Sequence, residues 1–216
     1  MSHENKLQVK EGHYKKWKYT TFSRFISFFY QIDSIAKLEG VHSILEIGPG
    51  SKLVADELKK MGYSVTTCDF DASVTPDVVA DVRTLPFKEG EFDCVMACQV
   101  LEHIPFADFE KIMDDFAKIT KKYVIISLPN RSTTFELVLR IPFINTLFKR
   151  NFFDWSIQFP VKFVGFEESG QHYWEIDFWT TSRKKVRTVF ERHFTVLKEF
   201  QPPMNKYHRF YVLERK

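Results

Sequence analysis

Residues 43–51 read SILEIGPGS, and this stretch decides the fold. A short apolar run that ends in glycine is typical of a buried parallel strand. Gly48 and Gly50 let the backbone come close to a ligand, and they open a helix pattern at 51–61 that Gly62 ends. A strand, a glycine-containing turn and a helix form the first unit of a wound α/β sheet.

The residues that follow repeat this unit. Apolar or β-branched runs predict further strands at 64–70, 77–82, 92–98 and 122–128. Between the last two, residues 105–119 carry apolar side chains on one face at helical spacing. Such alternation predicts a doubly wound, mostly parallel, Rossmann-like sheet with right-handed crossovers.

The two ends of the chain depart from this alternation. At 20–39, Phe and Ile recur at spacings of three and four and predict a helix with one apolar face, which Gly40 ends. Near the C-terminus, 177–192 predicts a helix, and 193–200 and 207–215 predict two strands. Their short connection allows an antiparallel pair. We therefore expect an α/β fold with seven strands and an antiparallel last strand.

The length of 216 residues fits one sizeable domain. We expect an N-terminal arm and capping helix at 1–40, and one domain at 41–216 with an aromatic-rich insertion at 131–176. The chain has 23 Phe, an unusually high number, and much of this excess lies in the insertion, after the fifth strand. It has three interpretations: a satellite core, a lid over the substrate, or a peripheral membrane contact through 131–153, where Arg and Lys intersperse apolar residues. We favour a core that also forms a lid.

The composition is that of an ordinary globular protein, with 44% hydrophobic and 27% charged residues. A net charge of +3 argues against a dedicated nucleic-acid binder. The cysteines are sparse and odd in number, and the Lys-rich residues 1–18 lack the apolar core of a signal peptide. No stretch reaches the ~18 apolar residues of a transmembrane helix. Together these features indicate a cytoplasmic protein.

In an open α/β sheet, ligands bind beyond the carboxyl ends of the strands. The candidate residues at these ends are Glu46, Gly48, Gly50, Asp69, Phe70, Asp81, Val82, Cys98 and Gln99. Asp69 lies 23 residues beyond Glu46, where an acidic side chain can accept both hydroxyls of a ribose. A nicotinamide-dependent oxidoreductase is disfavoured, because Leu53 stands where the third glycine of a dinucleotide fingerprint belongs.

Five segments, LEIGPGS, CDFD, ADVRTLPF, FDCVMACQVLEHI and VIISLPN, resemble in order and spacing the motifs of class I S-adenosylmethionine-dependent methyltransferases. The resemblance is greatest to the broad group that includes the ubiquinone and menaquinone biosynthesis methyltransferases. It covers residues 43–130, the last helix and the last two strands. It implies an enzyme that transfers a methyl group from S-adenosylmethionine to a small-molecule acceptor and releases S-adenosylhomocysteine. The aromatic content suggests an apolar or aromatic acceptor.

The resemblance also implies a role for each candidate near the first two strands. Gly48 and Gly50 are similar to the glycines that pass beneath the methionine part of the cofactor. Glu46 is similar to the residue that helps hold its amino group. Asp69 resembles the acceptor of the ribose hydroxyls, and Phe70 would pack against the adenine.

Further along, the resemblance implies contacts with the adenine and one departure. Asp81 would accept the adenine amino group, and Val82 would offer its backbone N–H to the ring. Cys98 and Gln99 would line the cofactor after the fourth strand. The family often has a glycine where Lys52 stands, and we expect the Lys52 side chain to point to solvent.

Three residues are candidates on the acceptor side. His103 follows the fourth strand, where it could take a proton from a hydroxyl or amine; the alternative is a scaffold role. His172 and Tyr173 resemble in position a segment that approaches the substrate in some relatives. No further ligands stand near Glu102 and His103 at suitable spacing, so we expect no metal site.

Two alternative functions stay open. A non-catalytic module that binds the cofactor would have the same nucleoside site, with its acceptor side blocked by the aromatic insertion. A methyltransferase that acts on a macromolecule is the other. For nucleic acid, the absence of an Asn/Asp-Pro-Pro-Tyr/Phe sequence after the fourth strand argues against it.

Overall fold

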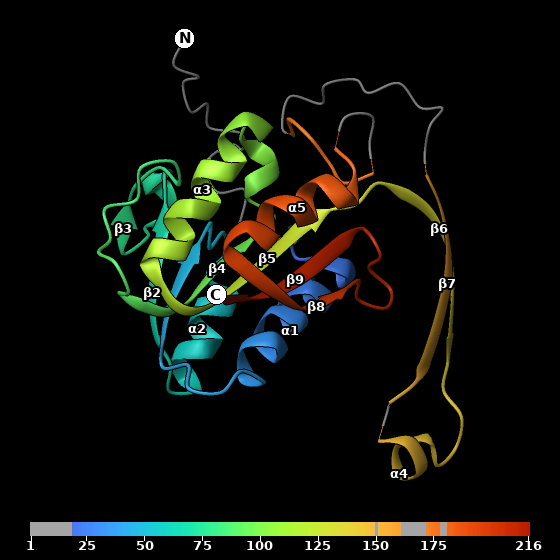
Figure 1. The fold of residues 1–216 in the computed structure, drawn as a ribbon. Helices are drawn as coiled ribbons and strands as arrows, with labels where there is room; N and C mark the ends of the chain where they lie inside the picture. The colour runs from blue at the N-terminus through green and yellow to red at the C-terminus, as the bar shows by residue number, and fades with distance from the viewer. Residues whose placement is uncertain (1–18, 150, 161–171, 178–180) are drawn as a thin grey trace.

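A computed structural model describes residues 19–149, 151–160, 172–177 and 181–216 (Figure 1). Its centre is a seven-stranded sheet with the strand order β3-β2-β1-β4-β5-β9-β8. The strands are β1 (Ser43–Ile47), β2 (Ser64–Asp69), β3 (Val78–Val79), β4 (Phe92–Cys98), β5 (Thr120–Pro129), β8 (Phe194–Phe200) and β9 (His208–Arg215). Strands β1 to β5 are parallel to one another, whereas β9 is antiparallel to both β5 and β8. The predicted sheet with its antiparallel last strand is confirmed.

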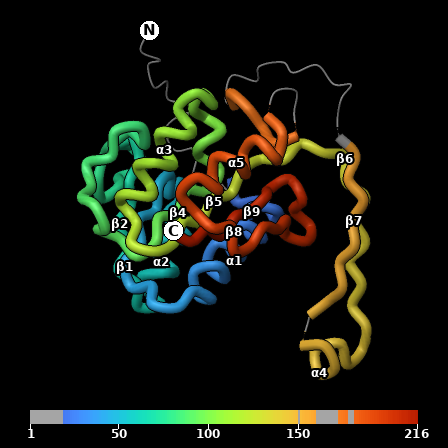
Figure 2. The backbone as a smooth tube through the Cα atoms, in the orientation of Figure 1, coloured from blue at the N-terminus to red at the C-terminus, as the bar shows by residue number. Residues whose placement is uncertain are grey.

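Helices cover both faces of the sheet (Figures 1 and 2). They are α1 (Phe22–Ala36), α2 (Leu53–Lys60), α3 (Phe106–Ile119) and α5 (Arg183–His193). Side chains of alternate strand residues pack in two separate cores, because successive side chains point to opposite faces of the sheet. Ile44 and Met96 pack with α1 and α2, while Leu45 and Val95 pack on the α3 and α5 side.

The strand order reverses between β1 and β4, the two neighbours at the centre of the sheet. Winding proceeds outward from β1 to β2 and β3, and in the other direction from β4 to β5. Adjacent crossovers therefore leave opposite faces of the sheet, and a crevice beyond the carboxyl ends of β1 and β4 is the expected ligand site.

Helix α1 buries only part of the predicted apolar stripe. Its buried face carries Ser27, Gln31 and Ser34 beside Ile35, while Phe22, Phe25 and Phe29 are exposed. The polar face is satisfied by the body of the protein, since Ser27 Oγ lies 2.6 Å from His208 Nδ1 and 2.8 Å from Asn205 Nδ2. Helix α1 is therefore held both by these hydrogen bonds and by Ile35, Ile32 and Phe28, which pack against the core on its side of the sheet.

Residues 132–149 and 151–159 of the aromatic insertion do not pack into a satellite core. They form a hairpin of β6 (Ser132–Leu139), α4 (Ile144–Phe148) and β7 (Phe153–Pro160), which projects from the sheet edge (Figure 2). Only after it does the chain return to the interior, where Trp174 and Ile176 are buried. Exposed and half-buried side chains alternate along β6, as in a two-stranded ribbon, and this differs from the packed core that the sequence analysis favours.

Candidate active site

The turn after β1 has a conformation and a packing that require glycine. Gly48 has a φ of +71°, and its N–H donates to the Cys68 carbonyl at 2.9 Å. A Cβ atom built on Gly48 would overlap the Val100 side chain, which follows β4. Gly50 also has a positive φ, of +51°. The backbone here is thus held close to the end of β4, as a ligand-binding turn at this position requires.

Glu46 in β1 is a buried carboxyl group, and its Oε2 has no hydrogen-bond partner among the described residues. Burial raises the pKa of Glu46 to about 8, with a smaller contribution from Asp56, while Lys59 and the Ala55 N–H act in the opposite direction. Buried polar atoms are nearly always paired. An unpaired oxygen beside a glycine turn therefore fits a partner supplied by a bound ligand, and a cationic amino group is a suitable one.

Asp69 and Phe70 lie at the carboxyl end of β2, next to β1 in the sheet. Asp69 is half-buried, and its Oδ1 accepts the Asp71 N–H at 2.9 Å. Burial raises the pKa of Asp69 above its usual value, partly offset by backbone N–H donors. The Phe70 ring is exposed. This arrangement leaves carboxylate lone pairs and an aromatic face at the edge where a nucleoside would lie.

Asp81 differs from the expectation, because its carboxylate is already paired with a neighbour. Arg83 Nη2 lies 2.6 Å from Asp81 Oδ2, and the Arg83 N–H donates to Oδ1 at 2.8 Å. Val82 between them is buried. Any adenine contact made by Asp81 must therefore share an oxygen with Arg83, since each carboxylate oxygen has two lone pairs.

After β4, Gln99 takes a left-handed conformation with a φ of +57°. Its N–H donates to the Ser127 carbonyl at 2.9 Å, and its side-chain amide donates to Ser127 Oγ at 3.2 Å. Burial raises the pKa of Cys98 to about 12, so its sulfur stays a thiol. Ser127 in β5 thus positions the turn after β4, a role that the sequence did not reveal.

Lys52 corrects our expectation about the family's missing glycine. Lys52 has a φ of +60° and precedes α2, so its backbone has the left-handed conformation that glycine accommodates without strain. Its ammonium group bonds to the carbonyl and hydroxyl of Thr75, in the loop that follows β2. The side chain therefore ties two loops of this edge together instead of extending freely into solvent.

The second part of the site lies beyond β4, around the short helix η4 (Leu101–His103). Glu102 is fully buried, and neither of its carboxyl oxygens has a hydrogen-bond partner among the described residues. Burial raises the pKa of Glu102 to about 7, although the charge of His172 lowers it. The His103 ring packs edge-on against the His172 ring, with 4.8 Å between centroids.

His172 is held in place by a buried carboxylate. Its Nδ1 lies 2.8 Å from Glu175 Oε1, which also accepts the Tyr207 hydroxyl at 2.9 Å. Burial by itself lowers the pKa of His172, but the hydrogen bond to Glu175 and the charges of Glu102 and Glu175 outweigh it and raise the pKa above its usual value. Neither Glu175 nor Tyr207 was among our sequence candidates, although Glu175 lies three residues after His172.

Neighbouring residues fix the segment that carries His172. The Trp174 indole donates to the Ile104 carbonyl at 2.9 Å, and the Tyr173 N–H donates to the Glu102 carbonyl at 2.8 Å. The Tyr173 side chain is exposed. The fold thus joins His103 and His172, two candidates from distant parts of the sequence, and places Tyr173 beside them.

Within the described ranges, one group of side chains could also hold a metal ion. Glu102, His103 and His172 each offer a ligand atom, and these atoms lie within 4.8 Å of one another. Our prediction of no metal considered only neighbours in the sequence and could not include His172. That no metal binds stays a prediction, which treatment with a chelator would test.

Comparisons with known proteins agree with this architecture. Residues 45–128 match the family described as methyltransferase domain. The chain is 30% identical over 114 residues to a demethylmenaquinone methyltransferase of Corynebacterium efficiens. That match covers 49% of this chain and 46% of the relative, so the aligned region spans less than half of the curated protein.

Solved structures share the fold at low sequence identity. A protein of Pyrococcus horikoshii OT3 superposes with a TM-score of 0.61, at 13% identity and 97% coverage of both chains. An S-adenosylmethionine-dependent methyltransferase of Aquifex aeolicus gives 0.60, at 12% identity, covering 97% of this chain and 100% of its own. Magnesium protoporphyrin IX methyltransferase of Synechocystis PCC 6803 gives 0.56, at 13% identity, covering 97% and 86%.

Residues 45–128 match the methyltransferase domain family, and the fold is the Rossmann-like fold of class I methyltransferases. The seven-stranded sheet, with the antiparallel β9 between β5 and β8, is the framework of that fold. The matched residues 45–128 run from β1 to β5 and include the first nine candidate residues at the sheet edge. The fold therefore positions Glu46, Gly48, Asp69 and Gln99 along one edge of the sheet, with the His103–His172 pair beyond β4.

Proposed function

We propose that this methyltransferase domain binds S-adenosylmethionine at the carboxyl edge of β1, β2 and β4 and methylates an apolar small molecule. The observation that carries the proposal is the pairing of Gly48, which has no room for a side chain, with the unpartnered buried oxygen of Glu46. Both lie where the strand order reverses. The match to the methyltransferase domain family and the demethylmenaquinone relative support this function.

The residues present fit the cofactor in charge and shape. Glu46 would accept hydrogen bonds from its amino group, and the Gly48–Gly50 turn would let the backbone approach its methionine part. Asp69 would accept the ribose hydroxyls, and Phe70 would cover the adenine. Asp81 and the Val82 N–H would contact the adenine edge, with Cys98 and Gln99 lining the other side. The cofactor, once bound, supplies a methyl group activated by a sulfonium.

Because the methyl group is already activated, the protein mainly aligns the acceptor and excludes water. For an acceptor with a hydroxyl or amine, we infer that the His103–His172 pair takes the proton. The Glu175 carboxylate accepts a hydrogen bond from His172 Nδ1, which leaves His172 Nε2 on the far side of the ring as the nitrogen that can accept a proton. Tyr173 lies at the exposed end of this pair and would contact the acceptor.

The test is methyl transfer from S-adenosylmethionine with a tritiated methyl group, incubated with the purified chain and an extract of cells that express it. We expect label in the organic-solvent fraction, because the acceptor is apolar. Label in protein or nucleic acid would instead indicate a macromolecular acceptor. No label in any fraction, with S-adenosylhomocysteine bound, would indicate a non-catalytic binding module. Asp69→Ala is the control, since it should abolish labelling without changing the circular dichroism spectrum.

A further inference from the structure

The β6–β7 ribbon has two chemically different faces. Cross-strand pairs such as Phe135 with Ile157 and Leu137 with Trp155 place apolar side chains on one face. Phe135 is 66% exposed, and Leu137 and Trp155 are each 60% exposed. The large exposed apolar side chains on this face are Phe135, Leu137, Leu139, Trp155, Ile157 and Phe159. The face that a soluble ribbon would normally bury is therefore turned outward.

The opposite face of the ribbon is polar and is bound to the body of the protein. Glu136 and Asp154 both pair with the buried Lys206, at 3.2 and 2.8 Å. Glu136 also accepts the Met204 N–H at 2.9 Å, in the turn between β8 and β9. These two are the acidic residues of 132–159, and both lie on the body side. The outward face of these strands therefore carries no negative charge among its described side chains.

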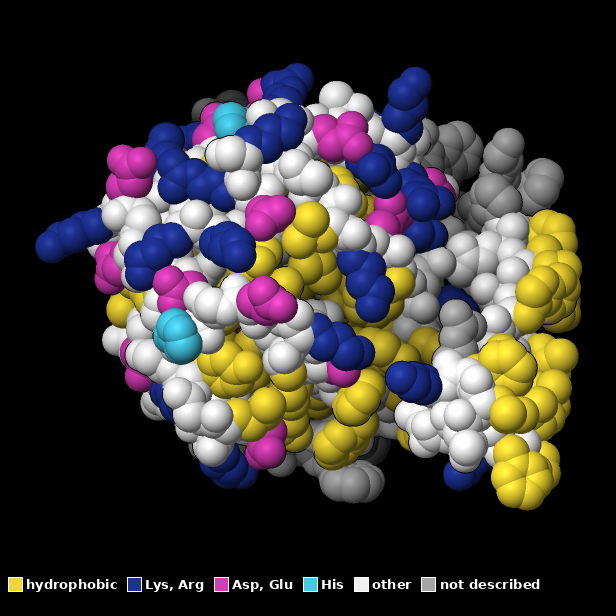
Figure 3. All heavy atoms as spheres, turned by 60° about the horizontal axis from the view of Figure 1, so that its bottom comes forward, with side chains coloured by type: hydrophobic (Ala, Val, Ile, Leu, Met, Phe, Trp, Pro, Cys, Tyr) yellow, Lys and Arg dark blue, Asp and Glu magenta, His cyan; other side chains and the backbone are white. Residues whose placement is uncertain are grey.

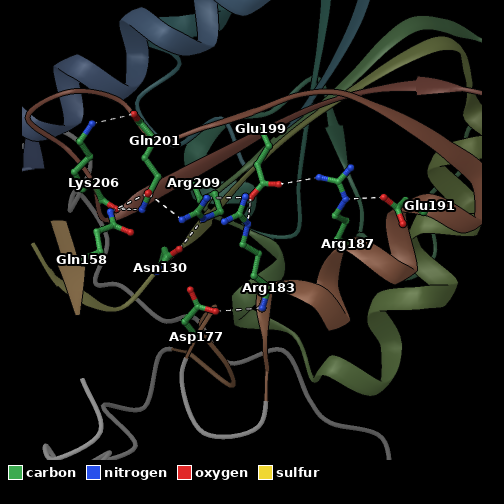
Figure 4. Close-up of polar contacts among 10 residues, drawn as sticks. All are labelled: Asn130, Gln158, Asp177, Arg183, Arg187, Glu191, Glu199, Gln201, Lys206 and Arg209. Carbon is green, nitrogen blue, oxygen red and sulfur yellow. Dashed lines mark hydrogen bonds and ion pairs between the residues drawn. The ribbon is translucent and has the colours of Figure 1, made fainter. Parts of the chain in front are cut away.

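A buried polar network anchors the base of the ribbon (Figure 4). Gln158 donates to Gln201 at 2.9 Å, and Gln201 Oε1 accepts from Arg209 at 2.9 Å. Arg209 also bonds Asn130 at 2.6 Å and Glu199 at 2.9 Å. Asn130 follows β5, so the network joins the ribbon to three strands of the central sheet. This anchoring fixes which face of the ribbon points outward.

The tip of the hairpin combines apolar and basic side chains. Phe143 is 77% exposed, and Leu147 and Phe148 of α4 are also exposed. Arg140 and Lys149 flank this tip and are exposed as well. In Figure 3, hydrophobic side chains cover the outer edge of the hairpin, at the right of the view. An apolar surface with Phe and Trp and a basic border matches the interface of an anionic lipid bilayer.

A second copy of the chain fits this face less well. A two-fold symmetric dimer would set this same face against its own copy. The face carries no negative charge among its described side chains, so a copy would offer no carboxylate to Arg140 and Lys149, whereas an anionic lipid surface supplies phosphates.

We propose that the outward face of the β6–α4–β7 hairpin docks on an anionic lipid surface. Side chains of β6, β7 and α4 would enter the boundary between headgroups and acyl chains, while Arg140 and Lys149 would bind lipid phosphates. The attachment is peripheral, since within the described part of the chain no helix is long and apolar enough to cross a membrane. This proposal does not depend on methyl transfer.

The test is co-sedimentation of the full chain with vesicles of phosphatidylcholine and phosphatidylglycerol, compared with phosphatidylcholine alone. We expect the wild-type chain to sediment with the mixed vesicles and more weakly with the neutral ones. The double variant Leu137→Glu, Trp155→Glu should weaken binding about tenfold or more, because it places charges in the apolar contact. Leu197→Glu is the matched control, since Leu197 is 47% exposed on β8 of the body and should not matter.

Two results would overturn the proposal. One is a wild-type chain that stays in solution with mixed vesicles. The other is a dimer, detected by light scattering without lipid, that the double variant dissociates and that does not bind vesicles; the occupant would then be a second copy. S-adenosylhomocysteine binding is measured on the same samples. Because the hairpin variants should leave it unchanged, failure of lipid docking and failure of the proposed function are distinguishable.

Discussion

Glu46 and Glu102 are buried carboxyl groups, and each lacks a hydrogen-bond partner on at least one oxygen among the described residues. Burial raises the pKa of Glu46 to about 8 and that of Glu102 to about 7. Such groups destabilise the folded chain when charged, and they persist where a ligand or a reaction uses them. Glu46 belonged to our sequence candidates because it ends a strand before glycine. The role of Glu102 depends on His172, which sequence spacing does not bring near it.

Glu46→Gln should stabilise the ligand-free chain and weaken its affinity for the cofactor. The folded-state pKa of Glu46 is about 8, above the usual value of 4.5. Below pH ~4.5 the carboxyl group is neutral in both states, and the stability of the folded chain is lost progressively as the pH rises through about 8 and the buried group ionises. Gln has no charge to bury. At pH ~9 we expect the free energy of unfolding to increase by about 5 kcal/mol, and at pH ~5 by less than about 1 kcal/mol.

Urea unfolding at the two pH values measures this difference. The control is Glu57→Gln, on the exposed side of α2, which should show no such pH dependence. In the same variant, affinity for S-adenosylhomocysteine should fall about tenfold, as for the loss of one charged hydrogen bond. A Glu46→Gln chain that is less stable than the wild type at pH ~9 would contradict this account of Glu46.

At the scale of elements, the parallel strands could be predicted because they are apolar on both faces and end at glycine or polar residues. The predicted start of the helix at 177 is wrong, since α5 begins at Arg183, after the Ser182 cap. The helix predicted over 20–39 is confirmed as α1, but Phe22, Phe25 and Phe29 of its apolar stripe are exposed. The β6–β7 ribbon was expected to be a packed core, yet it turns its apolar face outward, because polar contacts such as Glu136–Lys206 hold the other face to the body. Sequence periodicity shows that two faces differ, but not which one is buried.

The His172 ring and the Glu175 carboxyl group should titrate as a coupled pair, because they share a hydrogen bond. We expect the His172 ring to titrate above its usual pKa of 6.5, because the raising effects of Glu175 and Glu102 exceed the effect of burial. Glu175→Gln should move this titration to lower pH, since it removes the carboxylate that stabilises the imidazolium. Nuclear magnetic resonance of the imidazole carbons follows the ring directly and needs no acceptor.

The control for this titration is His193→Gln, which removes an exposed histidine near α3 and should leave the His172 curve unchanged. His172 also interacts with Glu102, His103 and His208, so Glu102→Gln is measured beside Glu175→Gln. In the proposed mechanism the neutral ring accepts the proton, so the methyl-transfer rate should rise with pH through the His172 pKa. An identical His172 titration in wild type and Glu175→Gln would refute the role given to Glu175.

At the scale of the whole molecule, Tyr207 links the site to the anchor of the hairpin around Arg209. Its hydroxyl donates to Glu175 at 2.9 Å, and its carbonyl accepts the Asn130 N–H at 2.7 Å. Asn130 leads from β5 into the hairpin, and Glu199 links the same arginine to Arg183 and Arg187 of α5. The sheet edge that carries the His103–His172 pair is therefore continuous with the base of the hairpin. An apolar acceptor that resides in a lipid layer would reach a domain held at that layer.

The central claim is that the edge of β1, β2 and β4 binds S-adenosylmethionine. Calorimetric titration of the full chain with S-adenosylhomocysteine, with NAD as the comparison ligand, tests it most directly. We predict saturable one-to-one binding of S-adenosylhomocysteine, its loss in the folded Asp69→Ala variant, and no binding of NAD. Binding of NAD alone, of neither ligand, or of S-adenosylhomocysteine with undiminished affinity in Asp69→Ala would contradict the account.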